Sequence, residues 1–108
     1  MSITPRGSGR LQQYDRGGAL ALRVLCDRSE GVPHLTAGVI RGPGMPPTLL
    51  RGHGFGAPLE DLGGRPVVVR CRCGWARLDP RRIGDAVAAG RRVARHAEVA
   101  WQDTPPVV

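Results

Sequence analysis

The sequence of 108 residues contains no lysine and no asparagine, although its basic residues number sixteen. Every one of those basic side chains is therefore an arginine. Lysine and asparagine have A-rich codons, whereas arginine, glycine, alanine and proline have codons rich in G and C. This bias predicts a GC-rich genome, such as that of an actinobacterium or one of its phages, and it accounts for part of the arginine excess.

Aromatic residues and long apolar runs are also scarce. Aromatic side chains make up only 4% of the chain, so large core anchors are few, and we expect Trp75 and Trp101 to be among them. No apolar run approaches the roughly 20 residues that span a bilayer. Residues 1–7 lack the apolar segment of a secretory signal. We therefore expect a cytoplasmic protein that has one core and no membrane contact.

The charge balance is strongly basic, with a formal net charge of +7. Such a charge favours a polyanionic partner. The arginine guanidinium binds phosphate and carboxylate in the same forked geometry, so we expect the partner to be nucleic acid or an acidic protein surface. Charge alone does not choose between the two.

Apolar alternation and β-branched runs predict a small sheet. Leu20, Leu22 and Val24 fall on one face of an extended segment, and the polar residues 26–33 after them are typical of a turn. The run of valines before Cys71 is the clearest strand signal. The predicted strands cover residues 19–25, 34–40, 48–51 and 66–71.

Asp79 and Pro80 mark the start of a predicted helix, because aspartate is a favoured N-cap and proline fits the first helical position. Apolar residues then recur at helical spacing, opposite a row of charged residues. We predict one amphipathic C-terminal helix over 80–101. Its apolar stripe consists of Ile83, Val87, Gly90, Ala94, Ala97 and Trp101.

The composition divides the chain into three parts. Residues 1–18 are rich in glycine and arginine without periodicity, which predicts a flexible basic N-terminal arm. Residues 19–101 carry the strand and helix patterns and form the predicted single domain. Residues 102–108 form a short tail.

Three cysteines are present, at positions 26, 71 and 73. An odd number without a secretory signal does not describe a disulfide scaffold, and a bridge between Cys71 and Cys73 would have poor geometry. A close cysteine pair with a distant third is more typical of a metal site or of buried thiols. We expect the metal site. The alternative is that Cys26 is a buried apolar residue and that Cys71 and Cys73 are ordinary thiols at the edge of the sheet.

The predicted strands place the ligands together. Cys26 ends one strand and His34 begins the next, while Cys71 ends the long strand and Cys73 follows at a turn that Gly74 allows. Two turns at the same end of a small sheet bring these side chains to one point. Three cysteines and one histidine form a standard tetrahedral zinc environment. The sequence therefore predicts zinc held by Cys26, His34, Cys71 and Cys73.

His96 provides an alternative to His34. It falls on the predicted helix beside the charged residues, where an exposed histidine is expected. If the helix instead folded back over the turn, His96 would become the fourth ligand. The sequence leaves this choice open.

The stretch from Val67 to Trp75 reads Val-Val-Val-Arg-Cys-Arg-Cys-Gly-Trp and resembles the second knuckle of zinc-ribbon proteins. The order Cys…His…Cys…Cys also resembles the zinc core of the actinobacterial RNA-polymerase-binding regulators. In those regulators the zinc is structural, and the protein contacts polymerase rather than catalysing a reaction. The resemblance covers residues 20–75 and implies a structural zinc and a partner in the transcription machinery.

These features predict an α+β fold, in which a small antiparallel zinc-ribbon-like sheet is followed by one C-terminal amphipathic helix. No catalytic signature is present. The predicted function is a non-catalytic, zinc-stabilised binding module, a regulatory or accessory factor that contacts nucleic acid or the transcription machinery. The predicted basic face for nucleic acid or an acidic partner consists of Arg81, Arg82, Arg91, Arg92 and Arg95.

Two other functions stay open at this point. A structural or assembly protein, such as a phage accessory or virion component, would use the C-terminal helix as a protein–protein interface. An enzyme would use only three of the zinc ligands and leave the fourth position to water.

Overall fold

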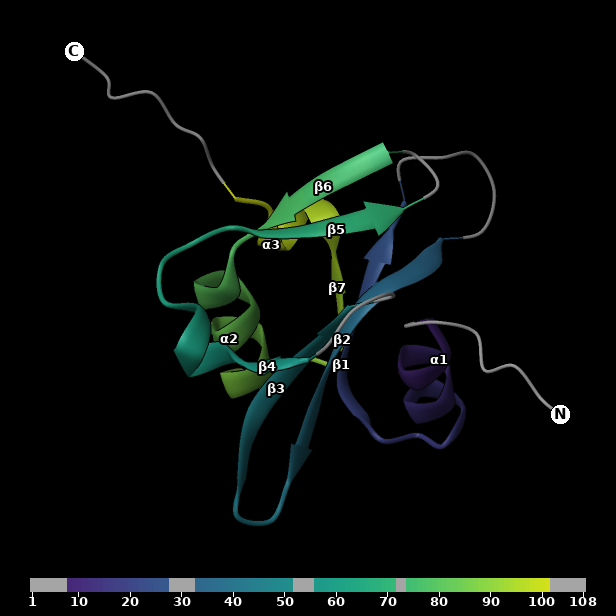
Figure 1. Ribbon diagram of the computed structural model, residues 1–108, viewed down its shortest axis with the longest axis vertical. Coiled ribbons are helices and arrows are strands. Elements are labelled where there is room, and N and C mark those ends of the chain that lie inside the picture. The colour runs from purple at the N-terminus through teal and green to yellow at the C-terminus, as the bar shows by residue number, and fades with distance from the viewer. Residues whose placement is uncertain (1–7, 28–32, 52–55, 72–73, 102–108) are drawn as a thin grey trace, which may run out of the picture.

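The computed structural model describes residues 8–27, 33–51, 56–71 and 74–101. These residues form two sheets, a five-stranded one with the order β4-β3-β2-β1-β7 and a two-stranded one made of β5 and β6. All pairings are antiparallel except that of β1 with β7, so the prediction of an α+β fold with a mostly antiparallel sheet is confirmed (Figure 1). The elements are α1 (Ser8–Arg16), β1 (Leu20–Cys26), β2 (His34–Gly42), β3 (Met45–Arg51), β4 (Ala57–Pro58), the 3₁₀ helix η1 (Leu59–Leu62), β5 (Val67–Cys71), β6 (Gly74–Leu78), α2 (Pro80–Ala88), β7 (Val93–Arg95) and α3 (His96–Val99).

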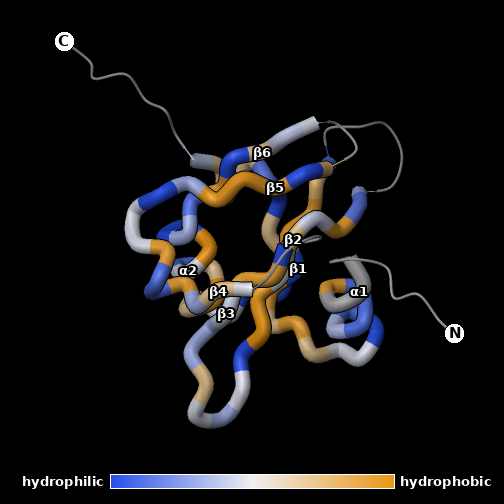
Figure 2. Tube along the Cα trace, in the orientation of Figure 1, coloured by the Kyte–Doolittle hydropathy of each residue, from blue (hydrophilic) through white to orange (hydrophobic). Residues whose placement is uncertain are grey.

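The core lies between the larger sheet and a layer made of the β5–β6 hairpin and α2. In β1, alternate residues are buried, so Leu22, Val24 and Cys26 face this layer. Val67 and Val69 face back from β5. The hairpin crosses one end of the larger sheet, and both β5 and the strands of the larger sheet carry apolar stretches (Figure 2). The core thus joins two sheets that share no strand.

Helix α1 packs on the opposite face of the larger sheet from α2 (Figure 1). Leu11 is 2% exposed. A methyl group built on Gly38 would lie only 3.0 Å from Leu11 Cδ1, so the absence of a side chain at Gly38 admits the helix. Asp15 forms an ion pair of 2.8 Å with Arg23 of β1. The segment predicted as a flexible basic arm therefore contains a helix over residues 8–16, which a buried leucine and an ion pair hold against the sheet, while residues 1–7 lie outside the described part.

The predicted helix start is confirmed at Asp79, whose Oδ1 accepts a hydrogen bond of 2.9 Å from the N–H of Arg81. The buried residues of α2 are Pro80, Ile83, Ala86 and Val87. Its apolar side is thus used inside the molecule rather than presented to a partner.

The single helix predicted over 80–101 is wrong beyond the end of α2. Gly90 has a left-handed φ of 76°. Its N–H donates to the carbonyl of Val87, and the N–H of Arg91 donates to that of Ala86, each over 3.0 Å. This pair of bonds is the Schellman motif, which ends a helix at a glycine. The chain continues as β7 and α3, and no helix in the described ranges is long and apolar enough to cross a membrane.

Candidate metal centre

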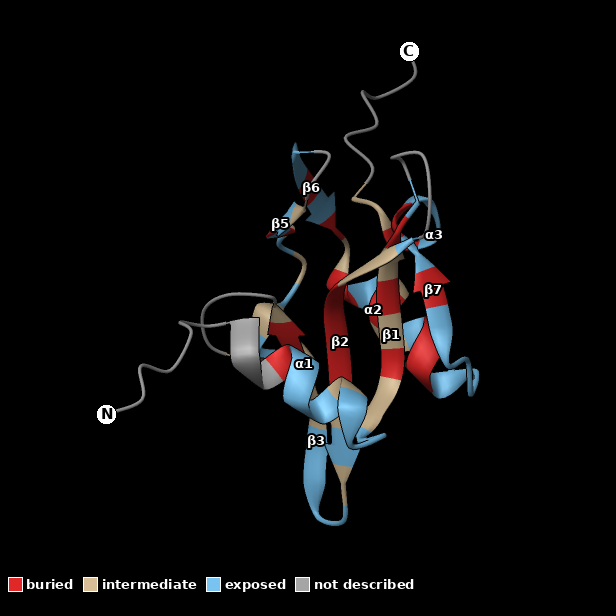
Figure 3. Ribbon diagram, turned by 90° about the vertical axis from the view of Figure 1, so that its right-hand side faces the viewer, coloured by how far each residue is buried: buried red, intermediate tan, exposed pale blue. Residues whose placement is uncertain are grey.

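Cys26 and His34 lie opposite each other at one end of the β1–β2 pair. Side chains of directly opposed residues in an antiparallel pair project from the same face of the sheet. The Cys26 side chain is 0% exposed and that of His34 is half-buried. The two strands that they end and begin, β1 and β2, are buried over much of their length (Figure 3). The two residues that flank the predicted turn are therefore paired as expected, while residues 28–32 of that turn lie outside the described part.

Cys71 reaches the same point from the second sheet. It is the last residue of β5 and is half-buried. One ligand atom from each of Cys26, His34 and Cys71 can be chosen so that all of them lie within 4.8 Å of one another. The two strand ends that the sequence predicts to converge therefore do so, and the group connects the two sheets.

The chemistry and the spacing of this group suit a metal ion. Two thiols and one imidazole are soft and intermediate donors of the kind that bind zinc and its neighbours in the transition series. With metal–sulfur bonds of about 2.3 Å, the donor atoms of a tetrahedral site lie about 3.8 Å apart. Because the zinc–nitrogen bond is shorter, the nitrogen and sulfur donors lie about 3.5 Å apart in such a site, so the donors have to approach one another by about 1.3 Å at most. Such a shift is within the reach of side-chain rotation, so the group can hold a metal ion.

The fourth predicted ligand, Cys73, lies outside the described residues. Cys71 and Gly74 on either side of it are paired at the end of the β5–β6 hairpin. Gly74 has a positive φ of 122°, the left-handed region that glycine favours and that the sequence predicts here.

His96 is not in the metal-binding group among the described residues. It is 1% exposed, and its Nε2 lies 2.6 Å from Oγ1 of Thr36. The Thr36 hydroxyl also lies 3.3 Å from the carbonyl of Val24, so it is shared between His96 Nε2 and the backbone of β1. The expectation of an exposed His96 is wrong, since residue 96 starts α3 instead of continuing a long helix.

The five arginines of the predicted basic face do not share one helix. They are distributed over the first turn of α2, the turn after it and β7, and part of their charge is neutralised. Arg81 and Arg92 are exposed. Three ion pairs hold the others, Arg82–Asp79 at 3.8 Å, Arg91–Glu98 at 2.6 Å and Arg95–Asp27 at 3.7 Å.

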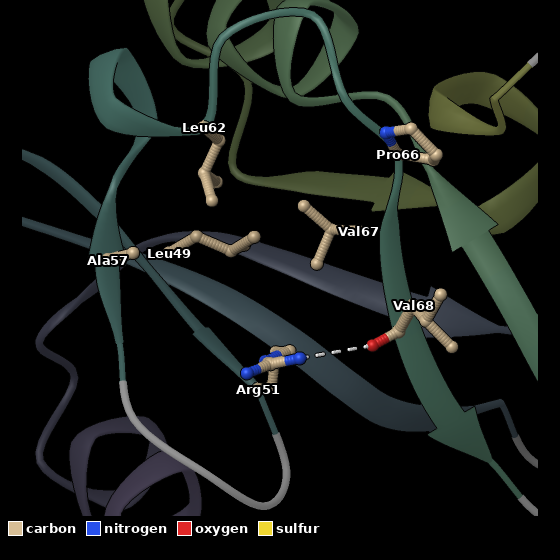
Figure 4. A pocket seen from close by; sticks show the side chains of 7 residues that line it. All are labelled: Leu49, Arg51, Ala57, Leu62, Pro66, Val67 and Val68. Carbon is tan, nitrogen blue, oxygen red and sulfur yellow. Dashed lines mark hydrogen bonds between the residues drawn. The ribbon is translucent and has the colours of Figure 1, made fainter.

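A cavity of about 290 Å³ lies between β3 and β5 (Figure 4). Leu49, Leu62 and Val67 line it with apolar surface. Arg51 is its charged residue, and Nη1 of Arg51 donates to the carbonyl of Val68 over 3.5 Å. This contact ties the larger sheet to the hairpin on the side of β3.

The sequence predicts the position of Trp75 wrongly. Instead of anchoring the core it is 61% exposed on β6. The sequence pattern that indicates the exposure of Trp75 is the alternation in β6. Ala76 and Leu78 are buried in this strand, while Trp75 and Arg77 are exposed. A tryptophan that shares a strand face with an arginine is on the outer face.

Comparisons of the chain with protein-family models, with curated proteins and with solved structures found no match.

Proposed function

We propose that the chain is a non-catalytic, zinc-stabilised binding module, a regulatory or accessory factor that contacts nucleic acid or the transcription machinery. The observation that carries this proposal is the convergence of Cys26, His34 and Cys71 from two sheets. Zinc is the metal that best suits these donors in a structural role, because it favours mixed sulfur and nitrogen ligands in a tetrahedron. Cys73 supplies the fourth ligand in this proposal and closes the site to water.

The composition of the core explains why a metal is needed. The described core cluster consists of aliphatic side chains without an aromatic ring, and four of its members are alanines. Small side chains bury little apolar area each, so a core of this kind stabilises a short chain weakly. A structural zinc site contributes on the order of 10 kcal/mol of binding free energy that is coupled to folding. That exceeds the stability of several kcal/mol that is typical of a small domain.

A closed site supports a binding role over a catalytic one. A zinc ion with four protein ligands has no position for water or substrate, so it holds structure without activating a nucleophile. The resemblance of residues 67–75 to a zinc-ribbon knuckle agrees with this role. The net charge of +7 supports an anionic partner.

Metal content tests the proposal. Native mass spectrometry of the purified chain should find one zinc ion per chain. His34→Ala should lose it, because the imidazole is a ligand. His96→Ala is the matched control, since it removes a histidine that binds Thr36 instead; we expect a lower melting temperature with the zinc retained.

Cys73→Ser separates the closed site from an open one. In a closed site the substitution removes a ligand, so the zinc affinity should fall by orders of magnitude. If zinc stays bound with unchanged affinity and cobalt substitution gives the spectrum of a water-bound ion, the site is open and the non-catalytic assignment is wrong. A protein purified without metal that folds cooperatively also contradicts the proposal.

A further inference from the structure

The outer face of the β5–β6 hairpin carries an exposed aromatic ring among arginines. Arg70 and Trp75 are directly opposed in the register, as are Val68 and Arg77, and all four side chains are exposed. The guanidinium carbon of Arg70 lies 5.8 Å from the centre of the Trp75 ring, within the range of a cation–π contact. We call these residues the hairpin face; its members are Val68, Arg70, Trp75 and Arg77.

The large exposed fraction of Trp75 needs a physical explanation. Burying its ring would stabilise the fold by removing a large apolar area from water. Yet 61% of the residue stays exposed, although the core cluster formed by the described residues contains no aromatic side chain. The opposite side of the same hairpin is packed, since Val69 and Ala76 are 0% and 4% exposed. The ring is therefore held outward by a strand whose other side is fixed.

The charge of the hairpin face selects the partner. The sequences of β5 and β6 contain arginine but no aspartate or glutamate. Arginine beside an exposed ring is the combination that binds single strands, because each base stacks on the aromatic side chain and its phosphate lies against the guanidinium. A duplex keeps its bases stacked inside, so it would use the arginines and leave the ring unused.

We infer that the hairpin face is a binding platform for single-stranded nucleic acid, with Trp75 as the stacking residue and Arg70 and Arg77 as phosphate contacts. This inference deepens the proposed function and rests on its nucleic-acid partner, while it moves the contact away from the five arginines predicted from the sequence. Because Cys71 ends β5, the proposed zinc holds the end of this strand of the hairpin that presents the ring. The metal is then a support for the platform rather than part of it.

Fluorescence anisotropy of a labelled oligothymidylate, titrated with the full-length zinc-loaded chain at low salt, tests the inference. Trp75→Ala should weaken binding about 5- to 100-fold, the contribution of one stacked base. Trp75→Phe should restore part of that loss. An oligouridylate should behave in the same way as the DNA, and a duplex of the same length should bind with an affinity that Trp75→Ala leaves unchanged.

Matched controls separate the platform from general charge and from unfolding. Tyr14→Ala removes another exposed aromatic residue, on α1, and should leave the affinity unchanged. Arg41→Gln removes the same charge as Arg70→Gln from an exposed position of β2 away from the hairpin. Only Arg70→Gln should reduce the dependence of affinity on salt by the equivalent of about one phosphate contact. Zinc content and thermal melts of each variant confirm that the fold is retained.

The outcomes distinguish this inference from the function on which it rests. Binding of the single strand that Trp75→Ala does not weaken overturns the platform but leaves a nucleic-acid partner in place. Equal dependence of duplex and single-strand binding on Trp75 also overturns it. If no nucleic acid binds at low salt while zinc is present, the platform and the nucleic-acid partner of the proposed function are both wrong.

Discussion

At the scale of single residues, Glu98 is held in its charged form by two neighbours. The backbone N–H of Arg95 donates to Oε1 over 2.9 Å, and a guanidinium nitrogen of Arg91 lies 2.6 Å from Oε2. The hydrogen bond from the Arg95 backbone and the one from Arg91 lower the pKa of Glu98 below its ordinary value. The carboxylate thereby joins α3 to the turn after α2.

We expect Glu98→Gln to lower the melting temperature at neutral pH by a few degrees at most, because the group is exposed. A carboxylate with a lowered pKa in the folded state stabilises that state above its unfolded pKa, and the contribution is lost as the pH falls through the folded value. Thermal melts of variant and wild type should therefore differ at neutral pH and converge in acid. A difference that is the same at every pH would contradict this account. Glu60→Gln, at an exposed position of η1, is the control.

The sequence predicts the ligand positions better than it predicts residue exposure. Cys26, His34 and Cys71 each end or begin a strand with a clear apolar pattern, so the strand boundaries place all three at strand ends. The sequence assigns them to one sheet, whereas Cys71 reaches the group from a second sheet. Trp75 and His96 are different. The size of Trp75 suggests burial although the alternation around it indicates the outer face, and the burial of His96 depends on a contact with Thr36, distant in the sequence, that no local pattern reveals.

At the scale of elements, the end of α2 depends on one glycine. Ala94 and Trp101 continue the apolar spacing of a helix, so periodicity favours a helix that runs on past Gly90. The left-handed φ of Gly90 ends it instead, which is the stop signal that a glycine after a helix provides. The pairing of β7 with β1 was not predictable, because three residues carry no periodic signal and their partner strand is distant in the sequence.

Substitutions at two glycines test whether α2 ends at Ala88 or continues as the helix predicted over 80–101. A methyl group on either Gly84 or Gly90 meets no atom within 4 Å, so each substitution acts through the backbone. Gly84→Ala lies inside α2 and should stabilise the protein by about 1 kcal/mol. Gly90→Ala should destabilise it by about 1 kcal/mol, because alanine resists a positive φ. Urea unfolding measures both, and stabilisation by Gly90→Ala would mean that the long helix forms.

The packing of α1 against the larger sheet leads to a second prediction for an element. Leu11→Ala should destabilise the protein by about 2–4 kcal/mol, because the leucine is buried against the sheet over Gly38. Gln12→Ala changes an exposed neighbour on the same helix and should have little effect. Denaturant unfolding compares the two variants. Equal stability of both would mean that residues 8–16 form a loose arm, as their composition suggests.

At the scale of the whole molecule, two sheets that share no strand are held against each other. The sheets are in contact through packed aliphatic side chains in the core and through the hydrogen bond of Arg51 with the hairpin. The proposed zinc site joins them at a third place. The sequence predicts an α+β fold because strand patterns precede a helix start, and it predicts the metal because the cysteines have no other evident role. It does not predict the division into two sheets, since strand order depends on contacts between distant segments.

The central claim is that a metal ion joins the two sheets and thereby stabilises the fold. The most direct measurement is the thermal unfolding curve, followed by circular dichroism, of the chain after zinc has been removed with a strong chelator. We predict that the stripped chain has no cooperative transition or melts at a much lower temperature, and that zinc restores the transition whereas magnesium does not. A stripped chain that unfolds cooperatively at the original temperature would contradict the claim.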